Sequence, residues 1–110
     1  MIEKTEPTFT VDIFMAGDLA TAKQVCREYC YRVGLCVTVT PADFIYTGGE
    51  EAGVRIGLLN YPRFPSSQED IEGAANGLAM ELLERLCQHS VLLVSPSRTT
   101  WVTRRDENGR

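Results

Sequence analysis

The sequence predicts an α+β domain with a ferredoxin-like split βαβ fold, an antiparallel sheet covered on one face by two helices. Three observations predict it: alternating apolar residues mark strands, apolar residues three and four apart mark two helices, and these elements follow one another as β-α-β-β-α-β plus a last strand. We expect a single domain at 8–105, between a flexible tail at 1–7 and a disordered tail at 106–110.

The first strand should lie in the centre of this sheet. From residue 9 to residue 15 the odd-numbered positions are apolar, and Thr10, Asp12 and Phe14 alternate with them. This is the period of a half-buried strand. The predicted sheet order is 2-3-1-4, with the last strand extending the far edge as the fifth.

A helix should follow over residues 19–33. Asp18 is a favoured N-cap residue, and Gly34 is a natural residue to end the helix. Between them an apolar stripe runs along one helix face. The stripe consists of Leu19, Ala22, Val25, Cys26, Tyr29 and Val33.

Residues 35–60 predict a long β-hairpin that turns at the paired glycines Gly48 and Gly49. Pro41 interrupts its first strand, because proline cannot donate a hydrogen bond to the sheet. We expect a one-residue bulge there that turns Phe44 and Tyr46 toward the core.

A second helix should run over residues 68–88. Ser66 with Glu69, or Ser67 with Asp70, fits a capping box, and both Gly73 and Gly77 would let another part of the chain approach closely. Apolar residues at 91–94 and the β-rich stretch at 99–104 predict the last two strands.

Charge and hydropathy exclude several classes of protein. The formal net charge is −4, which makes nucleic-acid binding an unfavourable interpretation. No apolar run approaches the roughly 18 residues of a membrane span, and the first residues hold no apolar core of a secretory signal. We therefore expect a cytoplasmic protein that does not bind membranes, with its cysteines as thiols.

Motifs for catalysis or metal binding are weak. Cys26, Cys30, Cys87 and His89 could in principle meet around zinc, but no C-x-x-C pair is present and Cys26 lies in the apolar stripe. Small buried thiols are the simpler interpretation. The sequence also lacks a nucleophile elbow and a glycine-rich phosphate loop. These observations predict a protein that is not an enzyme, without metal or cofactor.

Candidate binding residues fall in three places. The open face of the sheet should carry Asp12, Phe14 and Arg55, and the loop before the first helix holds Gly17 and Asp18. The third group consists of aromatic and arginine residues, which often anchor interfaces. Its members are Tyr61, Arg63, Phe64, Trp101 and Arg104.

Much of the chain resembles small phage or prophage proteins of unknown function. The stretches that carry this resemblance are AGDLATAKQVCREYCYRVGLCVTV and FIYTGGEEAGVRIGLLNYPRFP, together with LCQHS and TTWVTRR. The resemblance implies a phage-encoded protein that acts in the cytoplasm of an infected bacterium, as an accessory or counter-defence factor.

A second resemblance concerns topology. The sequence GDLA opening a helix, followed by a glycine and a strand, is similar to the small regulatory ACT domains. That similarity implies effector binding near Gly17, Asp18 and Leu19, across a dimer, although this helix is longer than theirs. Acylphosphatases share the fold but need an arginine in the loop that is Ala16–Asp18 here.

The function predicted from the sequence is therefore a non-enzymatic binding protein. It would be a homo-oligomer, through the face or edge of its sheet, and would occupy a bacterial protein partner. One alternative is an ACT-like module that binds a small effector or nucleotide. A second alternative is a thiol- or zinc-dependent activity of the cysteines and His89.

Overall fold

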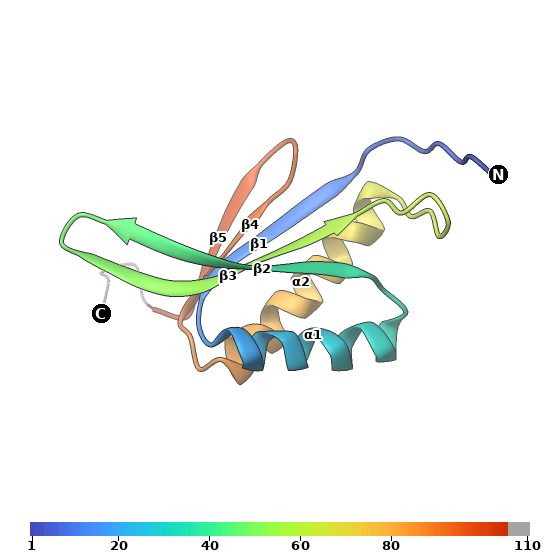
Figure 1. The fold of residues 1–110 in the computed structure, drawn as a ribbon. Helices are drawn as coiled ribbons and strands as arrows, with labels where there is room; N and C mark the ends of the chain where they lie inside the picture. Colours follow the sequence, from blue (N-terminus) through green and yellow to red (C-terminus); the bar gives the residue numbers. More distant parts are fainter. Residues whose placement is uncertain (106–110) are drawn as a thin grey trace.

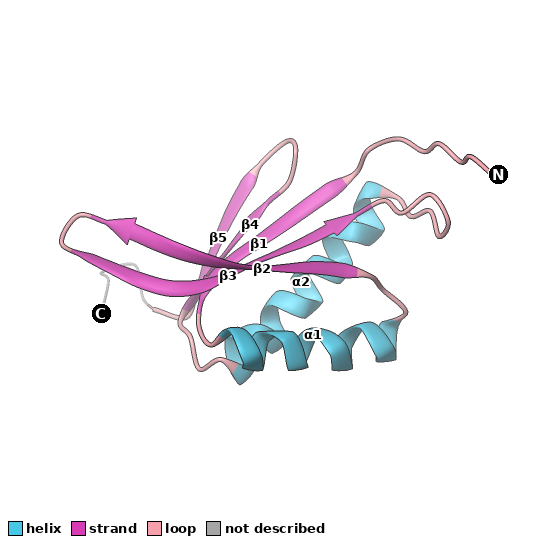
Figure 2. Ribbon diagram, in the orientation of Figure 1, coloured by secondary structure: helices cyan, strands magenta, loops and turns pink. Residues whose placement is uncertain are grey.

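The computed structural model describes residues 1–105, in which a five-stranded antiparallel sheet carries two helices on one face (Figure 1, Figure 2). The strand order is β2-β3-β1-β4-β5, so the predicted order is confirmed, with the first strand in the centre. The elements are β1 (Thr10–Ala16), α1 (Leu19–Val33), β2 (Val37–Tyr46), β3 (Gly49–Leu59), α2 (Gln68–Arg85), β4 (Ser90–Val94) and β5 (Thr99–Thr103). The predicted disordered segment 106–110 lies outside the described residues.

The burial pattern of β1 confirms the predicted alternation. Val11, Ile13 and Met15 are buried beneath the helices, whereas the residues between them are half-buried on the open face. The same core takes in Ile56 from β3 and Leu78 from α2, both completely buried. Burial of apolar area against two helices is therefore what holds the sheet to them.

Local signals set the ends of both helices. The Asp18 carboxylate accepts a hydrogen bond from the Thr21 backbone N–H at 2.9 Å, and Gly34 ends α1 in the left-handed region at φ 78°. Of the two capping pairs considered for α2, Ser67 is the N-cap and accepts from the Asp70 N–H. The helix ends at Arg85, earlier than the predicted residue 88.

The predicted bulge after Pro41 is wrong. The pairing of β2 with β3 runs without interruption from Val37 opposite Leu58 to Tyr46 opposite Gly49. Since β2 is an edge strand, the missing N–H of proline needs no partner on its free side. Phe44 therefore lies half-buried on the open face of the sheet, on the same side as Thr38, and not in the core.

One of the two glycines in α2 does permit a close approach. The Tyr29 hydroxyl donates to the Ala74 carbonyl at 3.1 Å, and a Cβ at Gly77 would lie only 2.4 Å from that hydroxyl. At Gly73 a Cβ would meet nothing within 4 Å, so the same prediction is wrong there. Tyr29 thus joins α1 to α2 through contact with a bare helix backbone.

An ion pair on the surface also joins the two helices, and it predicts acid sensitivity. Two hydrogen bonds from Arg85, and one from Gln24, lower the pKa of Glu28 from 4.5 to about 2. A lowered folded-state pKa stabilises the fold above pH 4.5, and this contribution is lost as the pH falls toward 2. We expect Glu28→Gln to weaken the pH dependence of the urea midpoint in this window. An unchanged dependence would contradict the assignment.

None of the helices within residues 1–105 is both long and apolar enough to cross a membrane.

Candidate functional site

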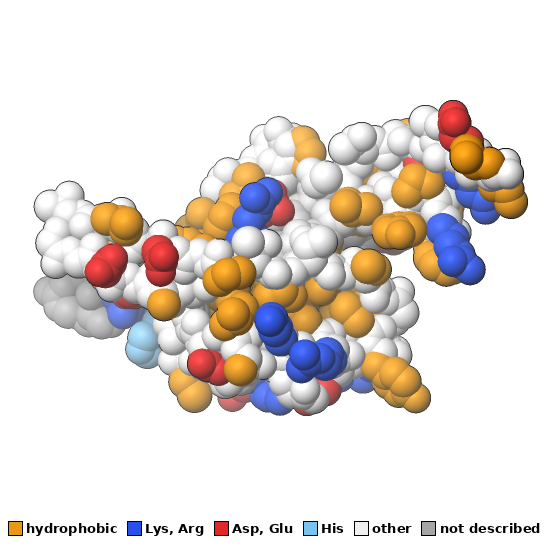
Figure 3. All heavy atoms as spheres, viewed as in Figure 1, with side chains coloured by type: hydrophobic (Ala, Val, Ile, Leu, Met, Phe, Trp, Pro, Cys, Tyr) orange, Lys and Arg blue, Asp and Glu red, His pale blue; other side chains and the backbone are white. Residues whose placement is uncertain are grey.

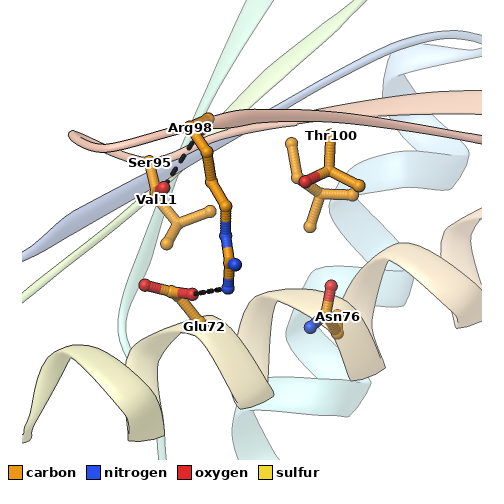
Figure 4. Close-up of a pocket in the computed structure, with 7 residues that line it drawn as sticks. Val11, Glu72, Asn76, Ser95, Arg98 and Thr100 are labelled. Carbon is orange, nitrogen blue, oxygen red and sulfur yellow. Dashed lines mark hydrogen bonds and ion pairs between the residues drawn. The ribbon is translucent and has the colours of Figure 1, made fainter.

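A cavity of about 310 Å³ lies between α2 and the end of the β4–β5 hairpin (Figure 4). Side chains from β1, α2, β4 and β5 meet there. The lining combines two apolar residues with a carboxylate, a guanidinium, an amide and two hydroxyl groups. These residues are Val11, Glu72, Asn76, Leu93, Ser95, Arg98 and Thr100.

The cavity lies where β4 stops pairing with β1. The register places Asp12 opposite Val94, and continuing it would place Thr10 opposite Pro96. Proline has no N–H to donate, so the ladder ends and the chain turns toward β5. The Arg98 carbonyl closes this turn by accepting from the Ser95 backbone N–H at 2.9 Å and from the Ser95 hydroxyl at 3.0 Å.

An ion pair joins α2 to this turn. The Arg98 guanidinium donates to Oε1 of Glu72 at 3.1 Å, and the Gln68 amide donates to Oε2 at 2.9 Å. Both interactions, that of Gln68 first, lower the pKa of Glu72 from its ordinary value. The cavity therefore presents a carboxylate that stays ionised at neutral pH.

The two charged side chains differ in exposure. The Glu72 side chain is 25% exposed, whereas that of Arg98 is 72% exposed. An ion pair with one partner so open to water contributes little to stability. Arg98 can thus exchange Glu72 for a charged ligand at small cost, and its guanidinium can donate to a second carboxylate.

The layout suits a small ligand with separated charges. Val11 and Leu93 give an apolar wall, Glu72 suits a cationic group, and Arg98 suits a carboxylate. Asn76 and Thr100 add neutral donors and acceptors on opposite sides of the opening (Figure 4). The volume lies at the lower end of the range for small-molecule sites, and five of the seven lining residues are polar, which suits a charged rather than an apolar ligand.

The structure places three of the predicted binding residues together on the open face of the sheet. Arg55 donates to Asp12 at 3.1 Å and lies over the Phe14 ring at 5.7 Å. Phe14 and Trp101 line a shallow hollow of about 270 Å³ on the same face, and Trp101 is 63% exposed.

The loop before α1 is occupied by structural contacts. The backbone at Gly17 has a φ of 142°, and a Cβ there would lie 2.3 Å from a methyl carbon of Leu86. The Asp18 carboxylate caps α1 and also accepts from the Thr21 hydroxyl at 2.8 Å. The two residues thus order the turn from β1 into the helix.

The remaining predicted residues lie elsewhere on the surface. Tyr61 and Phe64 pair across a tight turn beside a cavity of about 360 Å³, and Arg63 lies over the Phe64 ring at 5.4 Å. Arg104 donates to Glu84 at 2.8 Å. None of the ten residues predicted from the sequence lines the cavity at Glu72. Their roles, and the homo-oligomer, stay predictions.

The cysteines do not assemble with His89. Cys26, Cys30 and Cys36 line an open groove between α1 and β2, in the region where Figure 3 shows apolar side chains beside basic ones. Burial raises the pKa of the Cys26 thiol to about 11. Across the described part of the chain, no three His, Cys, Asp or Glu residues are arranged to hold a metal ion.

Sequence reasoning missed the residues of the cavity. Gln68, Glu72 and Asn76 follow one another at intervals of four, so they form a polar row beside the apolar stripe of α2. This row was the signal that the sequence offered, and the structure shows two of its members, Gln68 and Glu72, half-buried. Nothing local linked the row to Arg98, which follows Glu72 by 26 residues.

Comparison with known proteins identifies the fold. A phage SAM lyase in its apo state matches with a TM-score of 0.74 and 21% identity, over 96% of this chain and 97% of the lyase. The chain has the fold of this lyase. A phage SAM lyase in complex with S-methyl-5'-thioadenosine matches with a TM-score of 0.65 and 18% identity, over 94% of this chain and 95% of that one. No protein-family model and no curated protein matches the chain.

This finding contradicts the function predicted from the sequence. The sequence predicted a non-enzymatic binding protein, with an ACT-like module or a thiol or zinc activity as alternatives. The solved structures that share the fold over nearly the whole chain are instead those of a lyase. The prediction failed because it relied on histidine, cysteine and glycine-rich motifs, whereas none of the described residues that line the charged cavity is a histidine, a cysteine or a glycine.

Proposed function

We propose that this chain is a lyase that cleaves S-adenosylmethionine (SAM) and releases S-methyl-5'-thioadenosine, with Glu72 and Arg98 in its active site. The observation that carries the proposal is the charged cavity at Glu72, in a fold shared with a phage SAM lyase that binds S-methyl-5'-thioadenosine. SAM carries a sulfonium, an ammonium and a carboxylate, so its charges complement this lining.

The chemistry of such a cleavage restricts the role of the protein. The bond between sulfur and the γ-carbon of the aminobutyrate group breaks, and its electron pair stays on sulfur. Attack by the substrate's own carboxylate oxygen on that carbon gives a five-membered lactone, without any base. Removal of a β-proton would give vinylglycine instead, and it needs a strong base.

The cavity favours the first route. Among the residues that the structure describes, the charged side chains that line it are Glu72 and Arg98, and a carboxylate with a lowered pKa is a weak base. In this proposal Glu72 holds the positively charged end of the substrate, and Arg98 orients the reacting carboxylate. Because both reacting charges diminish in the transition state, the main contribution of a site of this kind is to hold the carboxylate oxygen in line with the bond that breaks.

The test is to incubate the purified chain with SAM and to follow both fragments by mass spectrometry. We expect S-methyl-5'-thioadenosine and homoserine lactone in equal amounts, without incorporation of ¹⁸O from labelled water into the freshly formed lactone. Vinylglycine as the second product would contradict the cyclisation route. An absence of cleavage beyond the spontaneous rate would contradict the proposed function.

A further inference from the structure

Gln68, the first residue of α2, is placed to hold Glu72 in position from a fixed point on the sheet. Its amide nitrogen donates to the Thr10 carbonyl at 3.3 Å and to Oε2 of Glu72 at 2.9 Å. The amide group thus spans from the backbone of β1 to the carboxylate in the cavity. Neither Gln68 nor Thr10 lines the cavity itself.

The Thr10 carbonyl is available for this contact because of the strand register. Phe9 accepts from the Asn60 N–H at 2.8 Å, so the backbone of residue 9 bonds toward β3. Successive residues of a strand point their backbone groups to opposite neighbours, so the Thr10 carbonyl faces the β4 side. The residue opposite Thr10 would be Pro96, which has no N–H. Gln68 supplies the donor that the sheet lacks.

We propose that Gln68 is a positioning residue for Glu72 in the cleavage reaction. With Gln68 on Oε2 and Arg98 on Oε1, the carboxylate is restrained at both oxygens. Each oxygen keeps lone-pair capacity for a cationic ligand group. When a substrate draws Arg98 away, Gln68 remains as the contact that fixes the carboxylate. This inference rests on the proposed function.

Within residues 1–105, the charged side chain that contacts Glu72 is that of Arg98. Arg98 approaches from the β4–β5 turn, and β1 and β4 contribute the apolar residues Val11 and Leu93. Gln68 is neutral and acts from the same helix. Removal of its hydrogen bond therefore raises the pKa of Glu72, and a second carboxylate at position 68 raises it further through repulsion between like charges.

The chain contains a second glutamine that donates to a glutamate one helical turn later, and this pair serves as a matched control. Gln24 donates to Glu28 at 3.1 Å on the exposed side of α1, away from the cavity. The variants are therefore Gln68→Met and Gln68→Glu, with Gln24→Met as the control. Glutamate is favourable at the start of a helix, so Gln68→Glu should keep the helix N-terminus intact even if Gln68→Met disturbs it.

Two measurements test the inference. The first is the titration of Glu72, followed by carboxyl ¹³C NMR without substrate. The second is the pH profile of kcat/KM for SAM cleavage. We expect the Glu72 pKa and the acid limb of the profile to rise together, by about one pH unit in Gln68→Glu. We also expect kcat/KM of Gln68→Met at pH 7 to fall about tenfold, and Gln24→Met to behave as wild type.

The outcomes separate the two proposals. If the wild-type chain does not cleave SAM, the proposed function fails, and the NMR titration still decides whether Gln68 controls the ionisation of Glu72. If the wild type cleaves SAM but neither the titration nor the pH profile moves in the Gln68 variants, the positioning role is overturned. If Gln68 had only a structural role, its variants would lose activity while the pH profile and the Glu72 pKa stayed unchanged. That result also overturns the positioning role.

Discussion

Replacing Glu72 by glutamine should lower kcat/KM for SAM cleavage by about 100-fold, because it removes the negative charge of the cavity while keeping nearly the same shape. Glu72 is held as a carboxylate by Gln68 and Arg98, and glutamine cannot provide that charge at any pH. The measurement is a steady-state assay of S-methyl-5'-thioadenosine release at neutral pH.

The control for this variant is Glu69→Gln, three residues earlier on α2. Glu69 is exposed, lies outside the cavity lining and has the same chemistry. We expect Glu69→Gln to retain the wild-type kcat/KM. The far-UV circular dichroism spectrum should be the same for both variants. If Glu72→Gln kept more than about a third of the wild-type activity, Glu72 could not hold the substrate's positive charge, and the site assignment would fail.

The largest expected effect on stability comes from Gly53→Ala in β3. Gly53 pairs with Ala16 at the end of β1, and an added Cβ would lie 2.2 Å from the Met15 carbonyl oxygen and 2.6 Å from the Phe44 ring. The backbone oxygen cannot move without disturbing the sheet. We expect the free energy of unfolding to fall by about 3 kcal/mol, as for an overpacked core, measured by urea denaturation.

The same substitution at Gly73 should have the opposite sign. Gly73 lies inside α2, and a Cβ there meets nothing within 4 Å. Alanine loses less backbone entropy than glycine on entering a helix, so Gly73→Ala should raise the free energy of unfolding by about 0.5–1 kcal/mol. Equal effects at the two positions would contradict the packing described for Gly53.

Several features of the fold could be predicted because their causes are local. The alternation in β1 follows from one strand having one face under the helices, and Ile13 is completely buried as the pattern indicated. Asp18, Gly34 and Ser67 set the helix ends through contacts within a few residues. Local chemistry of this kind is present in the sequence itself.

The position of Phe44 could not be predicted from local chemistry. Pro41 suggested a bulge. Because β2 lies at the edge of the sheet, however, its pairing with β3 continues through Pro41 and no hydrogen bond is lost. Whether a strand lies at an edge depends on the order of the whole sheet. Whether a bulge forms therefore depends on tertiary structure, and the residues near Pro41 could not predict it.

By itself the sequence determined the element order, the central strand, the cap of the first helix and the buried face of β1, because periodicity and capping act over a few residues. Only the tertiary structure decided where chemistry can occur. Glu72 and Arg98 meet because β4 stops pairing at Pro96 and its turn folds back over α2. Such a contact depends on register and on the path of the chain between distant elements, so no local pattern predicts it.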